Sequence, residues 1–225
     1  MIQRVYERAC ESSAEAAFVA TDDKRIAEAV QSFGGQAIMT SADHETGTDR
    51  IYEAALSIGL ADDEVVVNVQ GDEPLMPAAA IDQVASLLSE GARMATLMEA
   101  LTNPEEIFDP NIVKVVADNA GRALYFSRAP IPWSRGGFDH GSTDVTHLRG
   151  WYRHLGIYSY EMRLLKEFVV WPMTTLEQAE ALEQLRVLAN GESIQVAQSN
   201  GAVPPGIDTP EDVARVLEAL SGEGL

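Results

Sequence analysis

Residues 64–77 read EVVVNVQGDEPLMP, and this stretch decides the fold class. A run of valines that ends at Gly71 and Pro74 is typical of a short strand buried on both faces of a parallel sheet. Two adjacent carboxylates, Asp72 and Glu73, follow at the point where the strand becomes loop. Because ligands of parallel α/β sheets lie outside the carboxyl ends of the strands, the stretch also predicts a binding site.

Around this strand, strand-like and helix-like patterns alternate through the first half of the chain. This alternation predicts an α/β fold in which a mostly parallel sheet is flanked by helices. The expected strands are 16–23, 36–41 and 64–70; the expected helices are one that begins at Met1 and those within 23–35, 46–60 and 77–91.

The alternation of strand and helix patterns ends after Gly91, where strand-like segments follow one another with little helix between them. We therefore expect an antiparallel or mixed extension of the sheet in the second half. The expected strands lie within 93–101, 112–128 (with a hairpin turn at 119–121) and 153–162, a long lid-like loop covers 134–150, and helices cover 174–191 and 209–220. No linker divides the chain, so residues 1–225 are expected to form one domain.

Composition excludes several classes of partner. The chain carries 16 Lys and Arg against 35 Asp and Glu, a net charge of −19, which disfavours binding to nucleic acid and to anionic membranes. No apolar stretch approaches the length of a membrane span, and the start lacks the apolar core of a signal peptide. The single cysteine, Cys10, allows no internal disulfide. We expect a cytoplasmic protein.

Two separated aspartates lie at element junctions and could hold one divalent cation. Asp72 follows the valine strand, and Asp208 precedes Thr209, the expected cap of the last helix. Mg²⁺ is typically bound by one or two carboxylates together with substrate phosphates. The alternatives are that Asp72 serves only the turn and that Asp208 only complements the helix dipole.

Basic residues are scarce enough for their positions to be informative. Arg128, Arg153 and His154 lie in the second half, and Arg is well suited to hold a carboxylate in a bidentate pair. For Arg186 the spacing favours a different interpretation, an i,i+3 ion pair with Glu183 on the exposed face of a helix.

The chain resembles the 3-deoxy-manno-octulosonate cytidylyltransferase family along nearly its whole length. The resemblance rests on VATDD, ADHETGTDR, VVNVQGDEP, DPNIVKVV, ALYFSRAPIPW, RHLGIYSY, LEQLRVL and GIDTPEDV, which occur in the order of the family. It implies a Rossmann-like nucleotidyltransferase fold and transfer of CMP from CTP to 3-deoxy-D-manno-octulosonate (Kdo), for lipopolysaccharide synthesis. It also implies Mg²⁺ as cofactor and a homodimer formed by the strand-rich second half near HLGIYSY.

The same resemblance implies roles for individual residues. Asp72 and Asp208 correspond to the catalytic metal ligands. The nucleotide side, about 1–92, would include Gly47, Thr48 and Arg50. The sugar-binding and dimerisation side covers about 93–225, and the sugar-binding residues are Gln70, Arg128, His154, Glu183 and Gln184.

The sequence departs from the family pattern at its start. Family members open with a strand and a phosphate-binding loop of the type Pro-Ala-Arg-x-x-Ser-x-Arg-Leu-Pro-Gly-Lys-Pro-Leu, and Met1 and Ile2 correspond to positions just after it. The strands that neighbour this segment are expected to have open edges. Two alternatives follow: a related enzyme acting on sialate or an 8-amino sugar acid, and a truncated remnant that binds without turnover.

Overall fold

The computed structural model describes residues 1–44, 46–88, 91–135, 138, 150–207 and 209–222. Most of the expected loop 134–150 and the predicted metal ligand Asp208 therefore lie outside the described residues. Within the described part, no helix is long and apolar enough to cross a membrane.

The first half alternates between helix and strand as expected. Side-chain caps set two of the helix starts: Asp23 accepts a hydrogen bond from the backbone N–H of Arg25, and Thr46 accepts one from that of Asp49. The elements are α1 Ile2–Cys10, β1 Val19–Thr21, α2 Lys24–Ser32, β2 Ala37–Met39, α3 Gly47–Ser57, β3 Val65–Asn68 and α4 Ala78–Ser86.

The second half is richer in strands, also as expected, but it contains elements that the pattern did not predict. The unpredicted elements are α5, α6 and β8. The full set is β4 Met94–Ala100, α5 Glu105–Phe108, β5 Lys114–Ala117, β6 Ala123–Ser127, β7 Tyr152–Glu161, α6 Met162–Phe168, α7 Thr175–Glu180, α8 Gln184–Ala189, β8 Ile194–Gln198 and α9 Pro210–Gly222.

The long strand β7 organises the main sheet. It pairs with β4 along one edge, and with β3 and β5 at the two ends of its other edge. The pairs β1·β2 and β4·β8 are parallel, whereas β3·β7, β4·β7, β5·β7 and β5·β6 are antiparallel. The expected α/β class and mixed extension are confirmed, but the described pairings are more antiparallel than a mostly parallel core would give, because β7 enters between β3 and β4.

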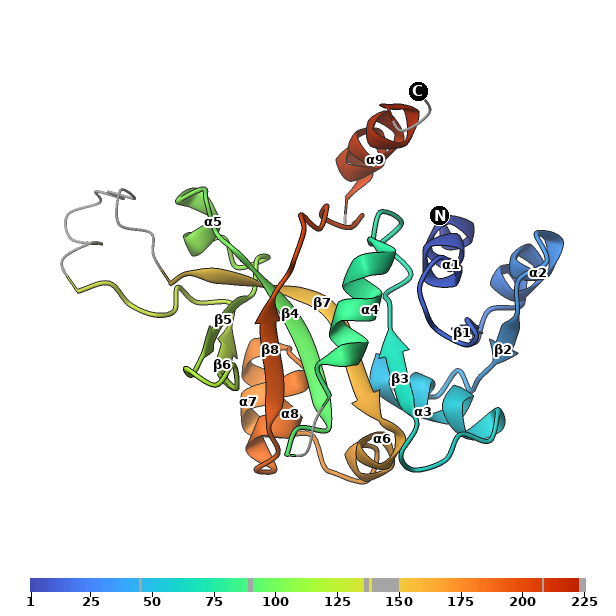
Figure 1. Cartoon of the computed structure of the whole chain (residues 1–225), viewed down its shortest axis with the longest axis horizontal. Helices are drawn as coiled ribbons and strands as arrows, with labels where there is room; N and C mark the ends of the chain where they lie inside the picture. Colours follow the sequence, from blue (N-terminus) through green and yellow to red (C-terminus); the bar gives the residue numbers. More distant parts are fainter. Residues whose placement is uncertain (45, 89–90, 136–137, 139–149, 208, 223–225) are drawn as a thin grey trace.

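Helices cover both faces of the main sheet, so the fold has three layers (Figure 1). On one face, α4 packs Ile81 and Val84 against Leu97 and Ile157 of the sheet. The core of the other face joins α6 and α8 to the inward side chains of β4, β6 and β7. Burial of these apolar surfaces is the main favourable contribution to folding.

The expectation that β3 is buried on both faces is wrong. Val65 is 46% exposed, and the following residues of β3 are only half-buried. In the described residues β3 pairs with β7 alone, and β1 pairs with β2 alone. One edge of β3 is therefore open, as is one edge of β1, and these strands line the same cavity.

The single helix expected over 174–191 is also wrong, because the chain breaks it into α7 and α8. Ala181 adopts a left-handed conformation with φ of 52°, which ends α7. Thr174 caps α7 in a capping box with Glu177. The break turns the chain before Glu183 and Gln184, and both line the cavity described next.

Candidate active site

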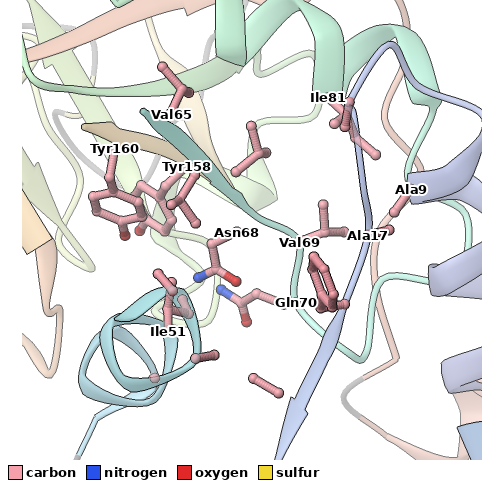
Figure 2. A pocket seen from close by; sticks show the side chains of 18 of the residues that line it. Ala9, Ala17, Ile51, Val65, Asn68, Val69, Gln70, Ile81, Tyr158 and Tyr160 are labelled. Atoms are coloured by element: carbon pink, nitrogen blue, oxygen red, sulfur yellow. The ribbon is translucent and has the colours of Figure 1, made fainter. Parts of the chain in front are cut away.

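A cavity of about 980 Å³ lies between β3, the segment that leads into β1, and α3 (Figure 2). It brings together residues from both expected sides of the site. Those among the sequence-predicted residues that line it are Gly47, Thr48, Arg50, Gln70, Arg128, Glu183 and Gln184. Asp72 and His154 are described but are not part of this lining.

Glu183 joins the two expected sides directly. Its carboxylate accepts hydrogen bonds from the backbone N–H groups of Gly47 and Thr48, each at 3.3 Å, and from the Thr48 hydroxyl at 2.7 Å. These donors belong to the first turn of α3, where the helix dipole favours a negative charge. Glu183 thus fixes the start of α3 against the start of α8.

Gln184 carries an unsatisfied donor. Its side chain is buried, with 4% of the residue exposed, yet its Nε2 has no hydrogen-bond partner among the residues that the structure describes. A buried amide without a partner costs on the order of 1–3 kcal/mol. In the lining of a cavity, such a group is suited to a ligand that accepts a hydrogen bond.

Gln70 follows β3 and reaches the same cavity. Figure 2 shows the amide groups of Asn68 and Gln70 lying close together beside α3. Gly156 of β7 makes room for Gln70, since a Cβ at residue 156 would lie 3.0 Å from Gln70 Nε2. A glycine is therefore needed on β7 for Gln70 to keep this position.

Arg128 is held by main-chain and carboxylate oxygens. Its Nε donates to the carbonyl of Glu180 at 2.8 Å, its Nη1 to the carbonyl of Pro110 at 2.9 Å, and its backbone N–H to the Glu180 carboxylate. The neighbouring Lys114 is fully buried and donates to the carbonyls of Asp109 and Ile112, and burial lowers the pKa of its ammonium. Glu180 and Lys114, which sequence reasoning missed, thus keep Arg128 and the 109–112 loop in place.

Arg50 spans the ends of the first strands. Its Nη1 donates to the Thr40 hydroxyl at 2.7 Å and lies 3.2 Å from the Asp22 carboxylate. It therefore links α3 to the segments that follow β1 and β2, at the rim of the cavity.

His154 packs edge-on against Phe126, and its ring also contacts Tyr158. Burial lowers the pKa of its imidazole from 6.5 to about 3, so the ring is neutral at physiological pH. A neutral imidazole offers one donor and one acceptor to a ligand. The neighbouring Arg153 is paired with Glu99.

Asp72 lies on the turn after β3 and is half-buried. Its carbonyl accepts a hydrogen bond from the backbone N–H of Ile207 at 2.9 Å, and Gly206 packs against both Asp72 and Glu73. The structure thus brings the chain just before residue 208 to Asp72, while Asp208 itself is outside the described residues. Among the residues described, no group of three or more His, Cys, Asp or Glu could hold a metal ion.

The predicted i,i+3 pair between Glu183 and Arg186 is wrong. Arg186 is buried, with 5% exposed, and forms a two-point ion pair with Glu177, while its guanidinium lies 4.3 Å above the Phe168 ring. Glu183 is engaged with α3 instead. The spacing argument failed because the left-handed turn at Ala181 brings Glu177 of α7 against Arg186 of α8, while Glu183 bonds to the start of α3.

Two tyrosines that line the cavity were also missed. Tyr158 and Tyr160 lie two residues apart on β7, with ring centroids 5.9 Å apart, and burial raises the pKa of both phenols. The alternation of polar aromatic residues in RHLGIYSY is the signal that could have found them, because residues i and i+2 of a strand share a face.

Comparisons with known proteins identify the family of the chain. A family model described as cytidylyltransferase matches residues 1–194. The fold and cavity therefore belong to a nucleotidyltransferase of the cytidylyltransferase family. Relatives named 3-deoxy-manno-octulosonate cytidylyltransferase match almost the whole chain at about half identity, so within that family the chain belongs with the 3-deoxy-manno-octulosonate cytidylyltransferases.

Proteins of that name from Cellvibrio japonicus (strain Ueda107) and Vibrio vulnificus (strain CMCP6) are 56% and 50% identical to it. These matches cover 98% and 99% of this chain and 88% of each relative.

A solved structure of CMP:2-keto-3-deoxy-manno-octonic acid synthetase complexed with CTP is 38% identical, with a TM-score of 0.88. The match covers 99% of this chain and 88% of that chain. A structure of 4-diphosphocytidyl-2C-methyl-D-erythritol synthase, 13% identical with a TM-score of 0.63 over 97% of this chain and 89% of its own, shares the fold alone.

Proposed function

We propose that this chain is an enzyme that transfers CMP from CTP to the anomeric hydroxyl of Kdo, giving CMP-Kdo and pyrophosphate for lipopolysaccharide synthesis. The observation that carries the proposal is the buried, unpartnered Nε2 of Gln184 in a cavity that also presents Gln70 and Glu183. Amides and a carboxylate in one wall suit a polyhydroxylated ligand, because they donate to and accept from hydroxyl groups. The names of the relatives, and the CTP in the similar solved structure, support the choice of substrates.

In the reaction, the anomeric oxygen of Kdo forms a bond to the α-phosphorus of CTP, and the bond from that phosphorus to the bridging oxygen of pyrophosphate breaks. The contribution of the protein is to place the two substrates and to exclude water. Gln184 and Gln70 would bind Kdo hydroxyls, and Arg128 would face its carboxylate. Gly47, Thr48 and Arg50 would lie on the cytidine side.

The residues around Asp72 fit a hard divalent cation such as Mg²⁺. Asp72 provides a carboxylate at a strand end, and the Gly206–Ile207 segment is held against it by a backbone hydrogen bond. We infer that Asp72, together with Asp208, which directly follows the Gly206–Ile207 segment in the sequence, would hold Mg²⁺. When bound, the ion would neutralise charge on the phosphates and acidify the attacking hydroxyl.

We also infer that the chain forms a homodimer through its second half and works in the cytoplasm. The residues of HLGIYSY are part of the main sheet and are mostly buried, so they can support an interface but do not themselves form an exposed surface. Two exposed apolar side chains of the second half, Leu124 at 62% and Val170 at 76%, are available for association. Light scattering after gel filtration tests the dimer.

The activity is tested by measuring CMP-Kdo and pyrophosphate formation from CTP, Kdo and Mg²⁺. Because β3 and β1 leave open edges on the cavity, the assay uses two forms: the 225-residue chain and the same chain preceded by a family-type strand and loop. Product from either form supports the proposal. Absence of product from both, with both shown to be folded, contradicts it, as does faster turnover of sialate than of Kdo.

Gln184→Leu tests the residue that carries the proposal. We expect the KM for Kdo to rise about tenfold, the effect of losing one hydrogen bond to a ligand. Gln178→Leu, at an exposed position of α7, is the matched control and should leave the KM unchanged. Equal KM values in the two variants would show that Gln184 does not bind the sugar.

A further inference from the structure

An irregularity in the main sheet lies beside the proposed sugar site. Along the β4·β7 pair, Thr96 is opposite Tyr158 whereas the next residue, Leu97, is opposite Leu155. Two extra residues of β7, Gly156 and Ile157, therefore bulge out of the ladder. β-Bulges re-aim side chains and are frequent next to active sites.

The hydroxyl of Thr96 fills this bulge. It is fully buried and lies 2.7 Å from the carbonyl oxygen of Ile157, 3.1 Å from that of Leu155, and 2.9 Å from Nε2 of His154. A threonine hydroxyl has one hydrogen to donate, and a carbonyl oxygen can only accept.

The arrangement of donors and acceptors determines which nitrogen of His154 carries its proton. If Thr96 donated to Nε2, its oxygen would face the Ile157 carbonyl oxygen at 2.7 Å with no hydrogen between them, which is repulsive. If Thr96 donates to that carbonyl, its lone pair is available to the ring, and Nε2 must be the donor. The second arrangement satisfies the Thr96 hydroxyl, the Ile157 carbonyl and Nε2, and leaves only the more distant Leu155 carbonyl, at 3.1 Å, without a hydrogen from Thr96.

The other ring nitrogen, Nδ1, then carries a lone pair. No hydrogen bond to Nδ1 is found from the part of the chain that the structure describes, and the residue as a whole keeps some solvent exposure. The ring is kept from turning by Phe126 and Tyr158, whose centroids lie 5.0 and 5.2 Å from its own. His154 is not itself part of the cavity lining, but Tyr158, which packs against its ring, is.

We propose that Thr96 is a positioning residue: its hydroxyl fixes His154 in the Nε2–H form, so that Nδ1 accepts a hydrogen bond from a hydroxyl of the sugar acid. The second half of this statement rests on the proposed function, whereas the first half concerns the protein alone. Thr96 acts only through His154 and touches no substrate.

The first test is independent of any substrate. Nitrogen NMR of the histidine-labelled chain at neutral pH distinguishes the two neutral forms of imidazole, and His154→Gln assigns the signal among the 4 histidines. We expect the Nε2–H form in the wild type and in Thr96→Ser, and a mixture or the Nδ1–H form in Thr96→Val. An Nδ1–H signal in the wild type overturns the proposal even if Thr96→Val does not fold, and so does an unchanged Nε2–H signal in folded Thr96→Val.

The second test uses the active form of the enzyme. Thr96→Val should raise the KM for Kdo about tenfold with a smaller change in kcat and an unchanged KM for CTP, and Thr96→Ser should restore it. If Thr96 had a purely structural role, the KM for Kdo would stay unchanged, and the apparent kcat would fall because a smaller fraction of the enzyme is folded. If the proposed function fails, the kinetic test fails while the NMR result stands, so the two failures are distinguishable.

Discussion

Glu177 and Arg186 form a buried two-point ion pair that ties α7 to α8 across the left-handed turn between them. The Arg186 Nε and Nη2 lie 2.8 and 2.5 Å from the two oxygens of Glu177, and the pair raises the pKa of the guanidinium further above its usual range. Both side chains are almost fully buried. The pair therefore fixes the turn that brings Glu183 and Gln184 to the cavity.

Glu177→Ala should lower the free energy of unfolding by about 3–5 kcal/mol, because it leaves the guanidinium of Arg186 buried without its partner. Urea denaturation measures the change. The matched control is Glu7→Ala in the exposed i,i+3 pair with Arg4, where a loss of at most ~1 kcal/mol is expected. Equal losses in the two variants would mean that the buried pair does not hold the turn.

His154 should make the folded state less stable in acid. Its pKa is about 3 in the folded protein and 6.5 when unperturbed, so between these values the unfolded chain binds a proton that the folded chain does not. Stability is therefore lost as the pH falls below about 6.5, with a slope of up to ~1.4 kcal/mol per pH unit from this residue.

The measurement is urea denaturation at several pH values from 7 down to about 4. We expect His154→Gln to show a shallower decline in stability than the wild type over this range, since glutamine does not titrate. Parallel curves for the two proteins would show that His154 is accessible to protonation in the folded state.

Gly206→Ala should impair the metal side of the site. A Cβ at residue 206 would lie 3.0 Å from the backbone oxygen of Asp72, which cannot rotate away as a side chain could. The segment would have to move, and the hydrogen bond from Ile207 to Asp72 would weaken. We expect kcat to fall by about tenfold or more and the concentration of Mg²⁺ needed for half-maximal activity to rise.

The control for this change is Gly201→Ala, since a Cβ at residue 201 would meet no atom within 4 Å. It should behave as the wild type in both measurements. If Gly206→Ala also behaves as the wild type, the contact between the 206–207 segment and Asp72 does not support the metal site.

Local pattern predicted the parts of the fold that are locally determined. The alternation before Gly91 and a helix beginning near residue 174 follow from periodicity and cap residues; the sequence offers Thr174 or Thr175 as the cap, and Thr174 is the one used. Ala181 could not be predicted as a break, because alanine favours helix and only tertiary contacts hold its left-handed conformation. Spacing likewise could not find Glu177 as the partner of Arg186, nine residues away.

The same distinction between local pattern and tertiary contact applies to the candidate site. Placement of a ligand at the carboxyl end of β3 could be argued from Gly71 and Asp72 alone, and the structure does gather most of the predicted side chains into one cavity. Lys114 and Thr96 could not be found this way, because their roles depend on which backbone carbonyls the folded chain turns toward them. Those carbonyls become available only through a loop and a bulge that no sequence period encodes.

Gly156→Ala should act on the site through Gln70 and nothing else. The added Cβ would lie 3.0 Å from Gln70 Nε2 and 3.6 Å from its Cδ, and these are the side-chain atoms within reach, so the amide can move aside at little cost in stability. We expect the KM for Kdo to rise several-fold while the melting temperature changes little. A double-mutant cycle with Gln70→Ala isolates the mechanism: once Gln70 is removed, adding Gly156→Ala should have no further effect on the KM. An additional loss in the double variant would show instead that Gly156 is required by the bulge itself, and with it by the position of His154.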